Sequence, residues 1–365
     1  MREKQDLLSA PITVPPDFVG VHAHRWPMGD PVSPAPAYSF GAARSHDYDG
    51  AAWYRIHTAP QTFDWSRLDR WVEVHAAATR TLIYTLFGTP AWAASSPEQV
   101  DRYGMPGGAS PPRDLASVAT FVRALAARYN GDGNQRIQWI EAWNEPTFDE
   151  GSGGFWWGSA EQLAAMTRVV AIAARQVDPG IRVLSPGFAG DLAGRLKLSL
   201  PRLAQAQGSP MLQFLTAADG HGGKGSDWCD GIAFHCYNSP LQGSNAGFLL
   251  EILRVQKMLA LSGISLPLYD TEFGFLADDA FHRSTRGEQA TALRRCAAIQ
   301  AASGVRSLFF YAHDDDLVGN PSLHPEVGQA IGDVHGMMAG KTLKQVTLLP
   351  DGSVHVATTE RTFTW

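Results

Sequence analysis

The 365-residue sequence has few cysteines and no surplus of positive charge. Its three cysteines, Cys229, Cys236 and Cys296, are too few and too irregularly spaced for a disulfide framework or a zinc knuckle. We expect free thiols that mostly pack. The formal net charge is −6 and Lys and Arg are scattered singly, so the basic footprint of a nucleic-acid-binding protein is missing. We therefore expect no nucleic-acid partner.

Long apolar runs are also missing. None approaches the ~20 residues of a membrane-spanning helix, and residues 1–11 lack the apolar core and the cleavage site of a signal peptide. We expect no membrane span and a cytoplasmic location, or a periplasmic or secreted one if a signal peptide has been removed. The oligomeric state is not indicated. With 44% hydrophobic and 18% charged residues, the composition is typical of a globular protein.

Short β-rich runs alternate with helical stretches from about residue 17 to residue 340, which predicts repeated β-α units around a parallel sheet. Eight is the number of strands that closes a barrel. The eight runs are residues 18–24, 42–48, 80–87, 136–143, 181–186, 231–237, 266–273 and 306–313. The expected fold class is therefore α/β, a (β/α)8 TIM barrel with a small C-terminal β appendage.

Helical spacing of apolar residues predicts the intervening helices. These are residues 65–78, 114–129, 160–177, 248–263 and 286–304. Gly263 and Gly304 stand where a helix C-terminal glycine is expected. The segment "PMGDPVSPAPAYSFG" after the first strand is too rich in proline for an ordinary helix, so the first β-α unit should be irregular.

The C-terminal tail predicts a strand, a turn at Asp351-Gly352 and a second strand. We expect a catalytic barrel over residues 15–340 and a small β appendage over residues 341–365. Residues 11–14, "PITV", are candidates to join that appendage.

In a β-α barrel the active site lies at the carboxyl ends of the strands. Glu145 and Glu272 directly follow the fourth and seventh apolar runs, so both can point into one cleft. Cleavage of a glycosidic bond needs a proton donor and, in the retaining mechanism, a carboxylate nucleophile about 5 to 5.5 Å away. Glu141 lies inside the fourth strand, and we expect it to be a buried or rim ion-pair residue rather than a second acid.

The motifs "WNEP" after the fourth strand and "TEFG" after the seventh resemble the paired signatures of clan A retaining glycoside hydrolases. More specifically, "FVGVHAHRW", "FDWSRLDRWV" and "LIYTLFGTPAWAA" resemble glycoside hydrolase family 39. The resemblance covers about residues 17 to 320. In size the chain is most similar to the exopolysaccharide endoglycosidases of that family.

The resemblance implies the roles of individual residues. Glu145 matches the general acid/base, Glu272 the nucleophile, and Asn144 the residue that hydrogen-bonds the sugar 2-hydroxyl. Arg44 and Tyr237 match positions that contact the nucleophile. Their alternatives are a surface ion pair of Arg44 with Asp47 or Asp49, and a tyrosine ring packed on the barrel rim.

Further sugar-contacting residues are expected around the barrel mouth. His24 and His235 resemble histidines of the innermost subsite, with a plain rim position as the alternative, and Tyr311 stands near the usual place of a strand-eight tryptophan. His313, Asp314 and Asp315 follow it and could reach into the cleft, although an acidic run is more typical of a solvated loop. Aromatic rings that could stack on sugar faces are Trp26, Trp53, Trp92, Phe155, Trp156 and Trp157. At least one of the last three could instead plug the barrel mouth.

These observations favour a retaining glycoside hydrolase that cleaves a β-linked polysaccharide or oligosaccharide, endo-acting on a bacterial exopolysaccharide. The resemblance implies no metal and no cofactor. Three alternatives stay open: an exo-acting β-xylosidase-like enzyme, a non-catalytic carbohydrate-binding barrel, and a metal-dependent amidohydrolase. The last rests on His22-x-His24, because imidazoles two apart on a strand share a face and can bind one zinc ion.

Overall fold

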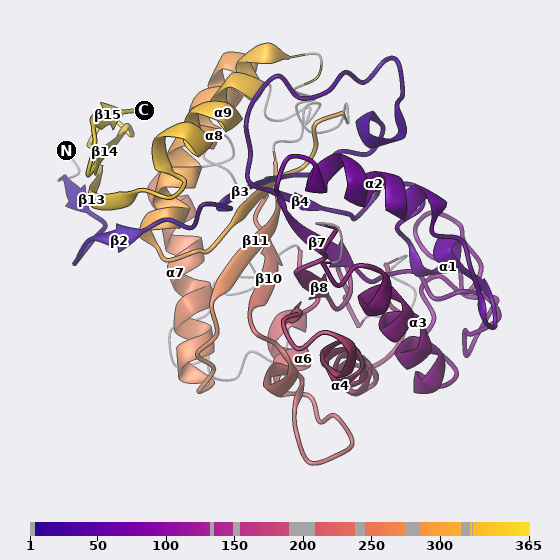
Figure 1. Cartoon of the computed structure of the whole chain (residues 1–365). Helices are drawn as coiled ribbons and strands as arrows, with labels where there is room; N and C mark the ends of the chain where they lie inside the picture. Colours follow the sequence, from indigo (N-terminus) through magenta and orange to yellow (C-terminus); the bar gives the residue numbers. More distant parts are fainter. Residues whose placement is uncertain are drawn as a thin grey trace. The chain divides into compact units, whose positions relative to one another are not determined.

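Eight parallel strands form one sheet in the computed structural model (Figure 1). The structure describes residues 4–131, 135–148, 154–189, 209–237, 245–274, 285–314, 322 and 324–365. The sheet order is β10-β11-β12-β3-β4-β7-β8-β9, so the strands follow one another in chain order around the sheet. Their bounds are β3 Val19–Val21, β4 Ala42–Arg44, β7 Thr81–Thr85, β8 Trp139–Glu141, β9 Arg182–Leu184, β10 Ile232–His235, β11 Leu268–Phe273 and β12 Leu308–Phe310.

The sheet returns on itself. The last strand, β12, pairs with the first, β3, with Phe309 opposite Gly20. Parallel bridges from Leu184 to Gly231 and from Phe188 to Phe234 continue the ladder from β9 to the segment of β10. This connectivity is the (β/α)8 TIM barrel that the sequence predicted, and all eight predicted strands are confirmed.

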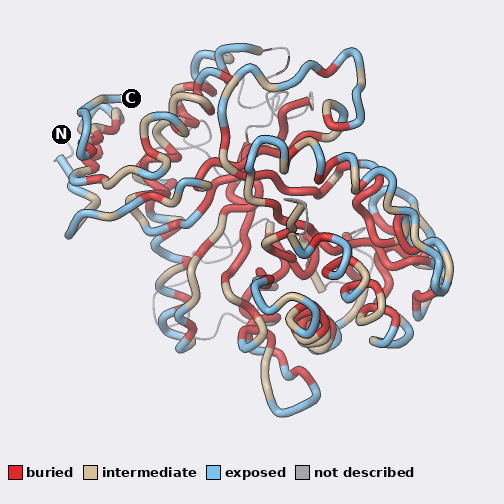
Figure 2. The backbone as a smooth tube through the Cα atoms, in the orientation of Figure 1, coloured by how far each residue is buried: buried red, intermediate tan, exposed pale blue. Residues whose placement is uncertain are grey.

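Close packing between β3 and β12 requires a residue without a side chain where the two strands meet. A Cβ on Gly20 would lie 2.2 Å from the ring of Phe309, so only glycine lets β3 and β12 pair here. The strands are buried along almost their whole length (Figure 2). Burial on both faces is why they appear in the sequence as apolar runs rather than as alternating patterns.

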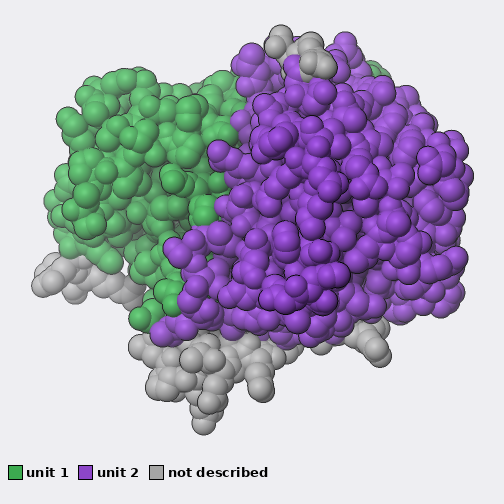
Figure 3. Space-filling model, turned by 60° about the horizontal axis from the view of Figure 1, so that its bottom comes forward, with its two compact units in different colours: residues 1–44, 235–260, 267–365 green, residues 45–234, 261–266 purple. Residues whose placement is uncertain are grey.

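By internal contacts the chain comprises two compact units (Figure 3). One contains residues 1–44, 235–260 and 267–365, and the other contains residues 45–234 and 261–266. The first includes β3, β4, β11 and β12, and the second includes β7, β8 and β9.

The predicted helices are confirmed, with α9 and the short α1 and α6 in addition. The helices are α1 Trp53–Ile56, α2 Ser66–Ala76, α3 Leu115–Arg128, α4 Ala160–Val177, α6 Pro210–Thr216, α7 Asn245–Leu261, α8 Arg286–Ala302 and α9 Pro325–Met338, with 3₁₀ turns η1 Trp26–Met28 and η4 Gly225–Trp228. Thr285 begins α8 with a capping box to Glu288. Gly304 follows α8 in the left-handed conformation, at φ 78°. The proline-rich segment after β3 holds no helix beyond η1, as expected.

A second, five-stranded sheet combines both ends of the chain. Its strands are β1 Gln5–Asp6, β2 Ile12–Thr13, β13 Thr342–Leu348, β14 Val354–Thr358 and β15 Thr362–Thr364. Antiparallel pairing joins β13 to β14 across the predicted Asp351-Gly352 turn, and β2 joins β13. This sheet packs beside α8 (Figure 1). A two-stranded ribbon, β5 His57–Ala59 and β6 Thr62–Phe63, lies elsewhere in the chain.

Two further findings concern the cysteines and the length of the helices. Cys229, Cys236 and Cys296 are free thiols, and all three are buried. Within the described residues, the helices are too short or too polar to cross a bilayer.

Candidate active site

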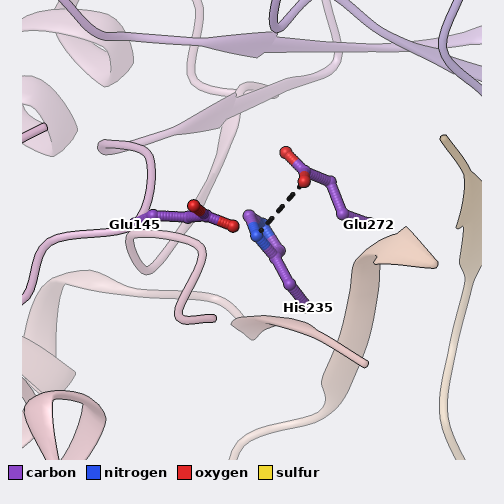
Figure 4. Close-up of side chains that lie close together, drawn as sticks. All are labelled: Glu145, His235 and Glu272. Carbon is purple, nitrogen blue, oxygen red and sulfur yellow. Dashed lines mark ion pairs between the residues drawn. The ribbon is translucent and has the colours of Figure 1, made fainter. Parts of the chain in front are cut away.

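The carboxylate of Glu272 lies near the end of β11 and is contacted by three side chains. Arg44 Nη1 donates to Oε1 at 2.6 Å, and the hydroxyl of Tyr237 donates to Oε2 at 2.7 Å. His235 Nδ1 lies 3.5 Å from Oε2, the ion pair marked by the dashed line in Figure 4. Glu272 itself is 4% exposed. Both carboxylate oxygens therefore accept hydrogen bonds, and the group is fixed in one orientation.

Arg44 is the cation of this site. Its side chain is fully buried beside Glu272, and a buried guanidinium needs a carboxylate partner because its desolvation is otherwise uncompensated. The alternative of a surface ion pair is wrong, because the Arg44 side chain is fully buried and pairs with Glu272. The guanidinium at the end of β4 therefore forms a buried ion pair with the carboxylate on β11.

Strand β10 supplies the other two contacts. His235 ends β10 and Tyr237 follows two residues later, so both side chains face the same side of the strand. The N–H of Cys236, between them, donates to the carbonyl of Glu272 at 3.0 Å and lies 3.1 Å from Asp270 Oδ1. The segment that presents His235 and Tyr237 is thus tied to the strand that presents Glu272.

Asp270 is a buried carboxyl that the sequence analysis did not single out. It accepts hydrogen bonds from Cys236 N–H and from the amide of Gln300 on α8. Burial raises the pKa of Asp270 to about 8, although these hydrogen bonds and the charge of His235 oppose the shift. The carboxyl of Asp270 is therefore largely neutral at pH 7, two residues away from Glu272.

Aromatic rings from β3 and β12 form a second group in the same unit. The ring of Tyr311 lies 5.1 Å from the ring of His22 and 5.1 Å from that of His24. Nε2 of His22 lies 2.9 Å from the carbonyl of Thr271. Across the described residues, neither histidine belongs to a group of His, Cys, Asp and Glu with the spacing of metal ligands. The zinc alternative thus gains nothing from this pair.

Asp314 was expected in a solvated loop, and that expectation is wrong. Its carboxylate is buried and accepts from the backbone N–H groups of His24, Arg25 and Trp26 at 2.7 to 2.8 Å, and from the hydroxyl of Ser33. Burial alone would raise the pKa of Asp314, but the His24 and Trp26 N–H groups and the charge of His24 lower it. The loop after β3 is thus fixed by the loop after β12.

His313 makes a similar link. Its Nδ1 lies 2.8 Å from the hydroxyl of Tyr38, and its Nε2 lies 2.8 Å from the carbonyl of Pro34. The proline-rich segment is thus fixed without a helix. Asp315 lies outside the described residues.

Glu145 belongs to the other unit and follows β8 by four residues. It is half-buried, and its backbone adopts φ 43°, a left-handed conformation uncommon for a residue other than glycine. Its N–H donates to the carbonyl of Gly187 at 2.8 Å, and the buried Asn144 bridges to the same glycine. Such conformations persist where the surroundings impose them, which is frequent at functional sites.

Glu141 is fully buried, one of the two positions expected for it. Its Oε2 accepts from the hydroxyl of Thr85 on β7 at 2.8 Å.

Three of the rings expected to stack on sugars are buried in the protein. Trp53 and Trp156 are 0% exposed and Phe155 is 5% exposed. Trp156 is 0% exposed and packs in a T-shaped contact with Trp143, so its ring is not open to a sugar and its assignment to substrate binding is wrong in this structure. Trp157, Trp92 and Trp26 are half-buried. The indole N–H of Trp92 donates to the carbonyl of His57, which fixes that ring.

Comparison with known proteins identifies a shared fold but no matching family. No protein-family model matches the sequence, and no curated protein matches it. Solved structures of glycosidases are similar in fold. A family 39 glycoside hydrolase from the gut symbiont Bacteroides cellulosilyticus WH2 aligns with a TM-score of 0.60 at 17% identity, over 96% of this chain and 70% of that chain.

A monomeric β-xylosidase from Caulobacter crescentus CB15 aligns with a TM-score of 0.60 at 17% identity, over 96% of this chain and 74% of that one. A family 44 xyloglucanase from Paenibacillus polymyxa aligns with a TM-score of 0.61 at 12% identity, over 96% and 82% of the two chains. At these identities the likeness shows the fold alone, the TIM barrel.

Proposed function

We propose that this protein is a retaining glycoside hydrolase that cleaves β-linked glycosidic bonds by double displacement. The observation that carries the proposal is the carboxylate of Glu272, near the end of the seventh barrel strand, with Arg44, His235 and Tyr237 around it. Three polar side chains converge on one buried carboxylate and leave it no freedom to rotate. A nucleophile needs that fixed orientation, because attack requires near-alignment with the anomeric carbon.

Glu145 is the proposed acid/base. It follows the fourth strand and Glu272 ends the seventh, and all carboxyl ends of a parallel barrel open on one face. We propose that the two carboxyl groups face each other at about 5 to 5.5 Å, the separation of retaining enzymes. Asn144, next to Glu145, would hydrogen-bond the sugar 2-hydroxyl.

The reaction has two steps. Glu272 attacks the anomeric carbon while the glycosidic C–O bond breaks, and Glu145 gives its proton to the leaving oxygen. Glu145 then removes a proton from water, the water oxygen bonds to the anomeric carbon, and the bond to Glu272 breaks. The product keeps the anomeric configuration of the substrate. Glu272 regains its negative charge as it leaves, and the hydroxyl of Tyr237 and the guanidinium of Arg44 would stabilise that charge.

The proposed substrate is a polysaccharide, cut internally, with a bacterial exopolysaccharide as the leading class. His24, Trp26, Tyr311, Trp92 and Trp157 are the proposed sugar contacts beyond the catalytic pair. Of the solved structures with this fold, one is named a β-xylosidase and another a xyloglucanase bound to xyloglucan. Exo-action on xylosides is therefore the second candidate.

The test combines two variants with a substrate panel of xylan, xyloglucan, bacterial exopolysaccharides and p-nitrophenyl glycosides. Glu272→Ala should lose turnover and regain it with azide, giving a glycosyl azide of inverted configuration. Glu145→Gln should lose turnover on poor leaving groups most. Glu141→Gln is the matched control, a glutamate at the end of the strand that precedes Glu145, and it should keep turnover.

Several outcomes would overturn parts of the proposal. Full turnover by Glu272→Ala or by Glu145→Gln would sink the two-carboxylate mechanism, and inverted product from the wild-type enzyme would exclude retention. Release of monosaccharide alone from every polymer would replace endo-action with exo-action. Binding without any hydrolysis would favour a non-catalytic carbohydrate-binding barrel, and activity lost to a chelator would favour a metal enzyme.

A further inference from the structure

A cavity of about 230 Å³ lies within the unit that contains Glu145. Its lining comes from two stretches, residues 47–55 and residues 87–105. The first stretch follows β4 and the second follows β7. Loops that follow barrel strands build the face on which barrel enzymes bind substrate. The cavity thus belongs to the substrate face without containing any residue assigned to catalysis above.

Four aromatic residues line this cavity, Tyr48, Tyr54, Phe87 and Tyr103. The rings of Tyr54 and Phe87 lie 6.1 Å apart at 77°, and those of Phe87 and Tyr103 lie 6.3 Å apart at 68°. Tyr103 is 48% exposed, so part of its ring is open to a ligand. Rings with an exposed face suit the C–H faces of a pyranose.

The position of Tyr54 depends on one glycine. A Cβ on Gly88 would lie 2.3 Å from the Tyr54 ring, and Gly88 also has φ 78°. Only glycine meets both requirements without strain. The guanidinium of Arg55 lies 5.7 Å from the centroid of the same ring. The space left by Gly88 and the contact with Arg55 together position the Tyr54 ring at the cavity.

Polar groups complete the lining. Asp49 forms ion pairs with Arg55 and Arg67. Asp47 accepts from the hydroxyl of Tyr103 and lies 3.3 Å from Nε2 of His46. The carboxylates of Asp47 and Asp49 in the lining would repel a uronate. A neutral, polyhydroxylated ligand fits this lining best.

The hydroxyl of Tyr54 adds a hydrogen-bonding group. Within the part of the chain that the structure describes, it has no hydrogen-bond partner, and Tyr54 lines the cavity. Asp47 is held at φ 61° beside it, in the left-handed region. A sugar hydroxyl could bond to Tyr54 without displacing any existing contact of that hydroxyl.

A second cavity in the described part of the chain shows the contrast. Its volume is about 560 Å³ and its lining includes Glu73, Thr79, Arg80, Gln135 and Gln138, with no aromatic ring. Those residues precede β7 and β8, so they lie at the amino ends of the strands. That face of a barrel serves stability rather than binding. The aromatic lining, and not the volume, therefore identifies the cavity at Tyr54 as the better candidate for binding a sugar.

We propose that the Tyr54–Phe87–Tyr103 cavity is a sugar-binding subsite for one neutral pyranose unit of a polysaccharide, separate from the subsite at Glu272. Its volume is below the ~300 to 1,000 Å³ of pockets for drug-sized ligands, which suits a single ring. The proposal rests on the proposed glycosidase function and deepens it. A second subsite of this kind implies that the substrate is a chain of several sugars rather than a disaccharide.

The test uses Tyr54→Ala, Tyr103→Ala and Tyr54→Phe, with Phe363→Ala as the matched control. Phe363 is a half-buried ring in the terminal sheet that packs on Trp365. The substrates are the best polysaccharide of the panel and the p-nitrophenyl glycoside of its sugar. Each alanine variant should lower kcat/KM on the polymer about tenfold, equal to about 1.4 kcal/mol. Activity on the aryl monoglycoside should stay within about twofold, and Phe363→Ala should change neither.

Unchanged activity on the polymer would overturn the subsite and leave the glycosidase proposal intact. Equal losses on polymer and aryl glycoside would overturn it too, because the rings would then support the fold or the catalytic pocket. Tyr54→Phe, which keeps the ring, should lose less than Tyr54→Ala. If the wild-type protein hydrolyses nothing, the glycosidase proposal fails by itself. Affinity electrophoresis in xylan and xyloglucan, wild type against Tyr54→Ala, then still tests the subsite, and equal retardation refutes it.

Discussion

Replacing Asp270 by asparagine should change how stability depends on pH. Asp270 is buried beside Gln300 and Cys236, and burial raises its pKa from 3.8 to about 8. Asparagine has nearly the same shape and no charge, and its carbonyl can still accept from the N–H of Cys236. The substitution therefore removes the titration while keeping most of the packing.

The sign follows from proton binding. Between about pH 4 and pH 8 the folded protein keeps the proton of Asp270 and the unfolded chain has lost it. Because the unfolded state binds fewer protons, the unfolding free energy of the wild type falls as pH rises, by about 1.4 kcal/mol per pH unit. From pH 5 to pH 8 this amounts to on the order of 4 kcal/mol, reduced near pH 8 where the folded protein also begins to lose the proton.

Urea unfolding at pH 5, 6, 7 and 8 and constant ionic strength would measure the effect. The unfolding free energy of Asp270→Asn minus that of the wild type should grow with each step and level off above pH 8. Asp17→Asn is a control for the loss of one carboxyl from the surface. A difference that stays constant from pH 5 to pH 8 would refute the reasoning, since Asp270 would then titrate alike in both states.

Three further predictions address the site and its supports. Tyr237→Phe removes a hydrogen bond to the Glu272 carboxylate, so kcat on an aryl glycoside should fall about 10- to 100-fold with little change in Tm; an unchanged kcat would contradict the role. Asp314→Ala leaves three backbone N–H groups without their acceptor, so urea unfolding should show a loss of about 3 kcal/mol or more, and a loss below about 1 kcal/mol would be against it. Trp156→Phe should lower the unfolding free energy by about 1 to 2 kcal/mol and leave KM within about twofold, whereas a large rise in KM at unchanged stability would restore Trp156 to the substrate site.

Much of the barrel could be predicted from the sequence because its strands are buried on both faces. Such strands appear as apolar runs, and each run was followed by polar residues at the end where chemistry is expected. The helix α9 was missed because Gly328, Gly332 and Gly336 lower its helical propensity. In the fold its buried residues Val327, Ile331 and Val334 compensate through packing.

The supports of the site could not be predicted for a different reason. Asp314 binds backbone groups of residues 24–26, about 290 positions earlier in the chain, and backbone groups carry no sequence signal. An acidic run looks the same whether water or N–H groups surround it. In the stretch "FWW", the sequence likewise could not say that Phe155 and Trp156 pack inside while Trp157 stays half-buried.

The stretch "DTE" on β11 shows how local geometry separates two similar residues. Asp270 and Glu272 are two positions apart, and in a regular strand their side chains would share a face. Between them, however, the pairing with β12 is irregular, because Asp270 lies opposite Leu308 and Phe273 lies opposite Phe310. Three steps on one strand match two on the other, the geometry of a β-bulge.

Because of the bulge, the side chains of Asp270 and Glu272 lie on different sides of the strand. Asp270 reaches Gln300 on α8, among the helices around the barrel, whereas Glu272 reaches Arg44 on β4. Asp270 is therefore buried among hydrogen-bond donors and binds a proton, whereas Glu272 meets a guanidinium and a hydroxyl. A substitution that restored regular pairing at residues 271–272 would turn Glu272 away from Arg44. We expect it to abolish activity even though both glutamates of the proposed mechanism remained in the sequence.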